Sequence, residues 1–190
     1  MRKIATSLVF LSFYAGLLAQ GTFTNTTSAT LEKVIRDYPN RFKDIKGEVI
    51  VQNPQTTEYQ SRVHVPGSSS CTVTRYNSVK NDVYSWECIL LQTEDFNTAK
   101  NKFREIFNQI KNSIIKLNGD KPYILNGQYE VPSEEKKFTT VVFELLPAVG
   151  EMKKVKIDLS LQAQITEWKL SLSVYDQDMK EDEPAISSGN

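Results

Sequence analysis

Hydrophobic residues at helical and then at strand spacing predict a short helix followed by four strands. The helix begins near Ser28 or Thr30, either of which could cap it, and Pro39 ends it. Its apolar residues share one helical face: Leu31, Val34, Ile35 and Tyr38. Four runs with a strand period follow, at 46–51, 58–65, 71–76 and 83–91. Their connections are too short for crossovers, so we expect an antiparallel meander.

The period then changes to that of a long amphipathic helix. Thr93 is a suitable N-cap, and Glu94 and Asp95 follow where the helix dipole favours acidic side chains. One apolar stripe runs over about six turns until Asn118-Gly119: Phe96, Ala99, Phe103, Ile106, Phe107, Ile110, Ile114 and Leu117. A stripe so rich in phenylalanine and isoleucine is typical of a helix that packs on the core.

Three further strands, at 138–146, 154–161 and 168–175, carry apolar residues on one face only. Pairing Leu161 with Trp168, and Leu145 with Val155, gathers all of these apolar residues on the same side. The opposite side would then carry Glu144 across from Lys156 and should face water. We therefore predict a two-layer α+β domain ordered α-β-β-β-β-α-β-β-β. Its sheet is mostly antiparallel, has about seven strands and is covered on one face by the long helix.

Residues 118–137 have no clear element, and loops of this length are often functional. Asn126-Gly127 is a strong signal for a two-residue hairpin turn, which would pair Ile124 with Tyr129 and Tyr123 with Glu130. This hairpin either packs on the body or projects from it. A projecting hairpin would expose Tyr123, Ile124 and Tyr129 as anchors for a partner.

The N-terminus has the layout of a secretory signal peptide, with Arg2 and Lys3 before an apolar run and a small residue, Ala19, at the expected cleavage point. The run is shorter than the ~20 residues of a membrane-spanning helix. We expect a signal peptide at 1–19, a linker at 20–28, a single domain at 29–177 and a disordered acidic and polar tail at 178–190. After cleavage no integral membrane segment is expected, and the protein would be exported, to the periplasm or outside the cell.

Cleavage would remove Arg2 and Lys3 from a chain with 23 basic and 23 acidic side chains, which leaves a slight excess of acidic ones. Nucleic-acid-binding proteins usually carry a basic patch or stripe. We therefore expect no nucleic-acid partner.

Both cysteines, Cys71 and Cys88, lie in one predicted hairpin. Pairing Tyr76 with Val83 across residues 77–82 places the cysteines directly opposite each other on the apolar face. Opposed Cα atoms are ~4.5 or ~5.5 Å apart, which a disulfide tolerates. Because export leads to an oxidising compartment, we predict a Cys71–Cys88 disulfide.

The sequence gives little support for a catalytic site or a metal site. His64 is the only histidine and alternates with Val63 and Val65, so it should point away from the core and from the cysteines. We accordingly assign no catalytic, metal-ligating or cofactor-binding residue.

The leading hypothesis is an exported, non-enzymatic protein-interaction module whose partner lies in the envelope or outside the cell. The first alternative is a carrier of a small apolar ligand in a pocket between helix and sheet. A hydrolase that uses unplaced carboxylates is the second alternative. The sequence indicates neither the oligomeric state nor the partner.

Overall fold

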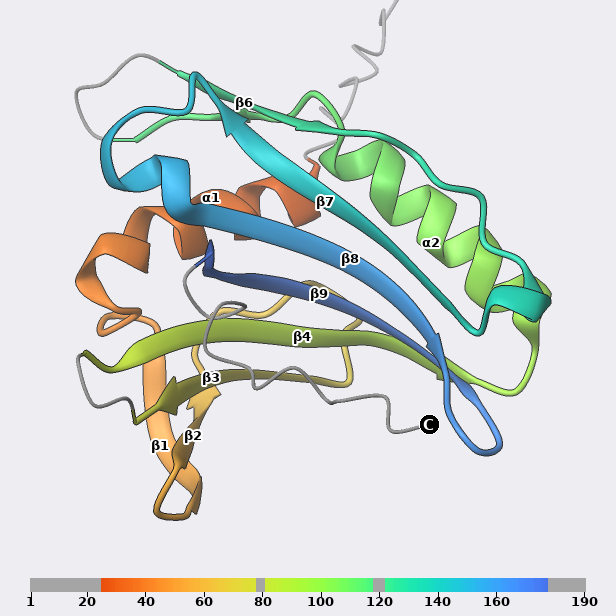
Figure 1. Ribbon diagram of the computed structural model, residues 1–190, viewed down its shortest axis with the longest axis horizontal. Coiled ribbons are helices and arrows are strands. Elements are labelled where there is room, and N and C mark those ends of the chain that lie inside the picture. Colours follow the sequence, from red (N-terminus) through yellow and green to blue (C-terminus); the bar gives the residue numbers. More distant parts are fainter. Residues whose placement is uncertain (1–24, 78–80, 118–121, 178–190) are drawn as a thin grey trace, which may run out of the picture.

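The computed structural model describes residues 25–77, 81–117 and 122–177, which form a nine-stranded antiparallel sheet and two α-helices. Both helices lie on one side of the sheet (Figure 1). The α+β class and the antiparallel sheet are therefore confirmed. The expected signal peptide at 1–19 and the expected tail at 178–190 lie outside the described residues.

The helices and strands of the described residues follow one another in this order: α1 (Thr26–Asp37), β1 (Lys46–Gln52), β2 (Thr56–Ser61), β3 (Ser70–Tyr76), β4 (Val83–Thr93), α2 (Phe96–Ile110), β5 (Ile114–Ile115), β6 (Tyr123–Gly127), β7 (Phe138–Leu146), β8 (Val155–Ala163) and β9 (Trp168–Asp176). Three short 3-10 helices connect some of them: η1 (Tyr38–Asn40), η2 (Glu134–Lys136) and η3 (Gly150–Lys154). The prediction of about seven strands is wrong because it contained neither β5 nor β6.

The sheet consists of two meanders joined at its centre. Its strand order is β1-β2-β3-β4-β9-β8-β7-β6-β5, so β4 pairs with β9, the last strand of each meander. A helix precedes each meander in the chain, α1 before β1 and α2 before β5. The described chain is thus two halves of similar element order that share one continuous sheet.

Helix α1 begins earlier than predicted, inside the expected linker at 20–28. Asn25 is the N-cap, and its side-chain oxygen accepts a hydrogen bond of 3.0 Å from the Ser28 N–H. Thr27 is buried and its hydroxyl donates to the Gln109 side chain of α2. The first turn is therefore held by a cap and by a contact with the second helix, neither of which the apolar pattern reveals.

Helix α2 is shorter than predicted and ends at Ile110. Its N-cap is Asp95, because the Asp95 carboxylate accepts from the backbone N–H groups of Asn97 and Thr98. At the other end Asn112 has a left-handed backbone, with φ of 62°. Ile114 and Ile115 then pair with β6 instead of extending the helix. Both residues are β-branched and therefore fit a strand well. The helical spacing from Ile110 to Ile114 did not reveal that the helix ends and a strand begins here.

Two of the three predicted registers are confirmed. Cys71 lies opposite Cys88 and Val73 opposite Trp86 in β3 and β4. In β7 and β8, Phe143 pairs with Ile157, and the expected cross-strand ion pair joins the Glu144 carboxylate to the Lys156 ammonium at 2.5 Å. The alternation of apolar residues was sufficient here because a slip of one residue would turn every apolar side chain outward.

The predicted register of β8 and β9 is wrong by two residues. Trp168 pairs with Ala163 rather than with Leu161, which pairs with Leu170. The tighter turn is closed by a hydrogen bond of 2.7 Å from the Gln164 N–H to the Glu167 carbonyl. A shift of two residues keeps every side chain on its face, so the apolar pattern could not distinguish the two registers.

The predicted hairpin at Asn126-Gly127 does not form. Strand β6 runs through both residues and pairs with β7, with Asn126 opposite Glu144 and Gly127 opposite Phe143. A Cβ atom at Gly127 would lie 2.6 Å from the Phe143 ring. The glycine is therefore required by the close approach of a buried ring, and its resemblance to a turn signal was misleading.

Candidate functional site

The two cysteines form the predicted disulfide, which is buried beneath the helices. Cys71 and Cys88 are bonded, and both belong to the hydrophobic core. Their neighbour Trp86 is also buried, and its indole N–H donates to the Ser61 hydroxyl at 3.0 Å. His64 is exposed, as predicted. Since both sulfur atoms are bonded to each other, this region provides a structural crosslink and no thiol nucleophile.

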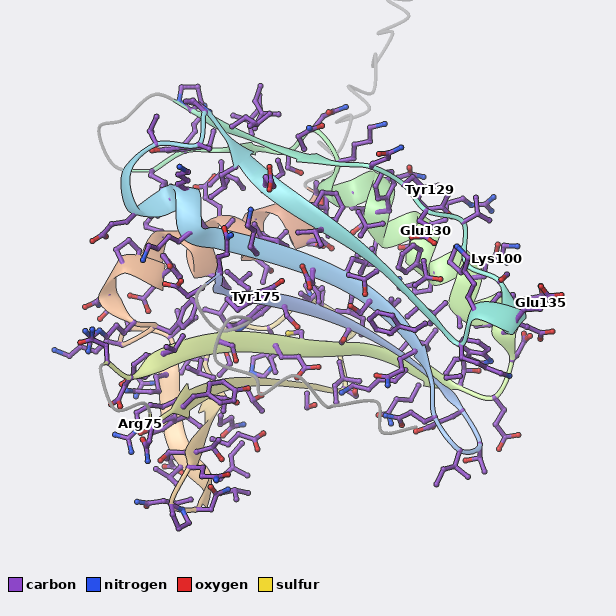
Figure 2. All side chains as sticks on the ribbon, in the orientation of Figure 1. Arg75, Lys100, Tyr129, Glu130, Glu135 and Tyr175 are labelled. Atoms are coloured by element: carbon purple, nitrogen blue, oxygen red, sulfur yellow. A yellow bond between two sulfur atoms is a disulfide. The ribbon has the colours of Figure 1, made fainter. Side chains whose placement is uncertain are left out.

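The residues predicted as partner anchors do not form one exposed surface. Tyr123 is buried on the inner face of β6, whereas Ile124 is exposed on the outer face. Tyr129 packs against α2, with its ring centroid 4.8 Å from that of Phe107 and 6.1 Å from that of Phe103 (Figure 2). Burial raises the pKa of the Tyr129 phenol, and the charge of Arg104 lowers it by a smaller amount. The segment that carries these tyrosines therefore packs on the body.

Ile124 instead belongs to a row of exposed apolar residues at one edge of the sheet. Ile114 lies opposite Ile124 across β5 and β6, and Ile124 lies opposite Leu146 across β6 and β7. All three side chains are exposed on the outer face. Because single exposed apolar residues are common, this short row is weaker evidence for a partner than a larger apolar surface would be.

The β1–β2 arm, residues 46–61, is the segment that projects from the body. Figure 1 shows the hairpin of β1 and β2 turning away from the central strands, and β2 remains paired with β3 from Thr56 to Gln60. The register of β1 against β2 shifts twice, between Lys46 and Val49 and again between Val49 and Val51. Such bulges bend a strand and increase its twist, which explains why this edge of the sheet turns away from the central strands.

Three consecutive β-branched residues are exposed on this arm. Val49, Ile50 and Val51 retain 53%, 53% and 48% of their surface. Strand β1 is also an edge of the sheet, so only β2 pairs with it. The arm therefore presents apolar side chains together with a strand edge, which is the usual composition of a docking surface.

The base of the arm is held by a lysine between two tyrosines. The Lys46 ammonium lies 4.6 Å from the ring centroid of Tyr59 and 5.4 Å from that of Tyr84. Both distances are within the range of a cation–π interaction. Gly47 is needed beside it, because a Cβ atom there would lie 2.7 Å from the Gln60 carbonyl oxygen. These contacts fix the direction in which the arm leaves the body.

The tip of the arm is equally well ordered. The Asn53 side-chain oxygen accepts from the N–H groups of Gln55 and Thr56, at 3.0 and 2.8 Å. Asn77, at the end of β3, donates from its side chain to the Pro54 carbonyl at 2.8 Å. The exposed valines and isoleucine thus lie on a hairpin whose turn is closed by hydrogen bonds.

A cleft of about 480 Å³, lined by both polar and apolar side chains, lies at one end of the central strands. The cleft takes side chains from η1 and the loop after it, from the start of β4 and from η3: Tyr38, Arg41, Phe42, Asp82, Tyr84 and Glu151. Lys154 and the last residue of β9, Asp176, also line it. Its volume is within the range of small-molecule sites, and its lining is mixed in charge.

Within 25–77, 81–117 and 122–177, no group of three or more histidine, cysteine, aspartate or glutamate side chains could hold a metal ion. In the same ranges, no helix has the length and apolar character needed to cross a membrane.

No family model matches the chain, and no curated protein is significantly similar to it.

Sequence reasoning missed the arm, although a signal for it was present. The run Val49-Ile50-Val51 has three apolar residues in succession where a half-buried strand should alternate with polar ones. It precedes a turn at Asn53-Pro54, which favours a hairpin. The prediction assigned this run to an ordinary strand, whereas the break in alternation marks the bulged and exposed edge.

Proposed function

We propose that the protein is an exported, non-enzymatic protein-interaction module that binds its partner through the β1–β2 arm. The observation that carries this proposal is the exposure of three consecutive β-branched side chains on a projecting edge strand. Burying apolar side chains contributes about 25 cal/mol for each Å² removed from water. Covering Val49, Ile50 and Val51 would contribute to binding in this way, because about half of each residue's surface is exposed.

The two bulges in β1 favour recognition by side chains over unselective strand addition. A long, flat edge strand would recruit any extended chain, and bulges are one of the ways in which proteins prevent this. Val49, Ile50 and Val51 lie at the second bulge, where the hydrogen-bonding ladder is irregular. The partner is therefore a protein whose surface has apolar pockets for these side chains.

Two parts of this proposal, that the protein is exported and that it is not an enzyme, are supported mainly by the sequence. The buried Cys71–Cys88 disulfide is consistent with an oxidising compartment outside the cytoplasm. Because the two cysteines are paired and His64 is exposed on a loop, the thiol and imidazole of a nucleophilic site are not brought together. These observations support the proposal without identifying the partner.

The alternative function, an apolar-ligand carrier, gains no support from the arrangement of α2 and the sheet. Phe103 and Phe107 of α2 and Phe143 of β7 are buried between the two layers, with ring centroids of Phe107 and Phe143 5.6 Å apart. Large side chains therefore fill the space in which the apolar ligand was expected.

Site-specific photo-crosslinking tests the proposed binding surface. A photoreactive amino acid in place of Ile50 should give a discrete crosslinked species in the native host, because the partner would cover this side chain. The matched control is Ile165, which is fully exposed in the turn between β8 and β9. Its replacement should give no such species.

Two outcomes would contradict this proposal. Equal crosslinking from positions 50 and 165 would indicate unselective contact, and no crosslink at position 50 would show that the arm has no partner. Ile50→Lys should abolish a species that is crosslinked from Val49, whereas Ile165→Lys should leave it unchanged.

A further inference from the structure

We infer that the cleft is a binding site for a small zwitterion, an α-amino acid or a short peptide, separate from the proposed interaction surface. Three features of the cleft support this: an arginine held in a constrained backbone, two opposite charges that have no partner among the described residues, and aromatic side chains in the lining.

The loop after η1 holds Arg41 in an unusual conformation. Arg41 and Phe42 both have left-handed backbones, with φ of 56° and 54°. Such a conformation is uncommon for any residue other than glycine, and is unfavourable for a bulky one. Strained residues of this kind occur often at ligand-binding sites, where the surrounding structure maintains them.

Two sets of contacts maintain this conformation. The Phe42 side chain is completely buried, and its N–H donates to the Asp37 carbonyl at 3.0 Å. The buried Asp37 carboxylate accepts from the N–H groups of Asp44 and Ile45, at 2.9 and 3.1 Å. Phe42 therefore anchors the loop and holds the backbone of Arg41 beside the cleft, while the Arg41 side chain is exposed.

Arg41 and Glu151 are the charges available to a ligand. Within the described parts of the chain, neither side chain makes a hydrogen bond or an ion pair. By contrast, Asp82 lies 4.0 Å from the Arg75 guanidinium, and Asp176 accepts a hydrogen bond from the Tyr38 hydroxyl. A ligand that carries both a carboxylate and an ammonium group would satisfy Arg41 and Glu151 together.

The remaining lining suits a ligand with a short side chain. Tyr38 and Tyr84 are half-buried and contribute aromatic surface beside the charges. A guanidinium binds a carboxylate through two parallel hydrogen bonds, which gives orientation as well as affinity. The cleft volume of about 480 Å³ accommodates an amino acid or a dipeptide, whereas a folded partner domain would not enter it.

Nuclear magnetic resonance titration of the purified protein tests this inference. L-alanine, L-glutamine and dialanine are the zwitterionic probes, and acetate and methylamine carry one charge each. At least one zwitterion should give saturable shifts in the amide signals of residues 38, 40–42, 81–84 and 150–154. Acetate and methylamine should bind at least about tenfold more weakly, since each satisfies only one of the two charges.

Matched substitutions identify the residues involved. Arg41→Gln and Glu151→Gln should each weaken binding of the zwitterion about tenfold or more. Arg104→Gln and Glu105→Gln, at exposed positions of α2, should leave it unchanged. Circular dichroism of each variant establishes that it is folded, and Glu151→Gln keeps the test decisive if Arg41→Gln unfolds.

Three results would overturn the inference. The first is the absence of saturable shifts with every zwitterion up to about 10 mM. The second is binding that survives both Arg41→Gln and Glu151→Gln. The third is acetate binding as tight as that of the zwitterions, which would indicate an anion site alone.

Discussion

At the scale of single residues, glycines show how one residue type serves different purposes in this fold. Gly67 has φ of 82° and Gly150 has φ of 56°, so both occupy backbone conformations that other residues rarely adopt. Gly127 is different, because its neighbour Phe143 leaves no room for a Cβ atom. A sequence shows that a glycine is present, but the requirement for it depends on what lies across the sheet.

Replacing Gly127 by alanine should therefore destabilise the protein. In an open strand position, alanine would be the better residue, because glycine loses more backbone entropy on folding. Here the new Cβ would lie 2.6 Å from the completely buried ring of Phe143. We expect Gly127→Ala to lower the free energy of unfolding by about 1–3 kcal/mol, measured by urea denaturation.

The double variant Gly127→Ala/Phe143→Leu separates crowding from other causes. If the ring is responsible, the double variant should lose less stability than the sum of the two single variants. Asn126→Ala, at the exposed neighbouring position, should change stability by no more than about 0.5 kcal/mol. A stabilising Gly127→Ala would show that Phe143 moves aside freely, and the explanation given for the glycine would be wrong.

At the scale of elements, the starts of both helices depend on caps that hydrophobic periodicity does not detect. Asn25 caps α1 and Asp95 caps α2, whereas the sequence suggested Ser28 or Thr30 and Thr93. Thr93 still contributes, because its hydroxyl accepts from the Asp95 N–H at 3.2 Å. Several polar residues precede each helix, and only the backbone path decides which of them is the cap.

The α2 cap should give the protein a pH-dependent contribution to stability. The pKa of Asp95 is below its ordinary value of 3.8, first because the Thr98 hydroxyl donates to the carboxylate and then because the Asn97 N–H does. A carboxyl whose pKa is lowered by folding stabilises the fold above its unfolded pKa, and this contribution is lost as the pH falls through the folded pKa.

Asp95→Asn removes this titration while keeping a side chain that can cap. Between about pH 5 and pH 2, the melting temperature of the unsubstituted protein should fall more steeply than that of Asp95→Asn. Glu94→Gln, at the exposed adjacent carboxyl, should follow the unsubstituted protein. Parallel curves for the unsubstituted protein and Asp95→Asn would show that the cap does not titrate as proposed.

The strands show where alternation of apolar and polar residues is sufficient to predict structure and where it is not. It placed Cys71 opposite Cys88 and Phe143 opposite Ile157, since both faces of each strand differ clearly in polarity. It could not fix Trp168 to within two residues, and it could not reveal that Ile114 leaves α2 for β5. The register of Trp168 depends on the length of the β8–β9 turn, and the pairing of Ile114 depends on the presence of β6 beside it. Both are properties of the assembled sheet.

The candidate sites were less predictable than the core. Of the three residues that a projecting hairpin would expose, Ile124 is exposed, Tyr123 is buried and Tyr129 packs against α2. The arm is visible in the sequence only as a break in alternation at Val49-Ile50-Val51. The cleft joins residues as distant in the chain as Arg41 and Glu151, and no local pattern connects them.

At the scale of the whole molecule, the two halves share one core. Strands β4 and β9 pair along most of their length at the centre of the sheet. Residues of α1, α2 and both meanders form a single hydrophobic cluster. Because the β4–β9 pairing and the core are shared, neither half should unfold alone, and we expect one cooperative unfolding transition.

The two tryptophans allow this expectation to be tested, because each reports on one half. Trp86 is buried in β4 and Trp168 in β9. In Trp168→Phe the fluorescence follows the first half, and in Trp86→Phe it follows the second. Within each variant, the urea midpoint from fluorescence should equal the midpoint from far-ultraviolet circular dichroism.

Removing a crosslink that joins two residues of the first half makes the test sharper. The disulfide joins two residues 17 apart within the first half, and closing a loop of that size stabilises a protein by about 3 kcal/mol. Replacing both Cys71 and Cys88 by alanine in the Trp86→Phe background removes this crosslink while the remaining fluorescence reports on β9. If the shared core couples the halves, the Trp168 midpoint should fall together with the circular dichroism midpoint. A Trp168 signal that kept its midpoint would mean that the second half is stable independently, and the continuous sheet would then join two separate folding units.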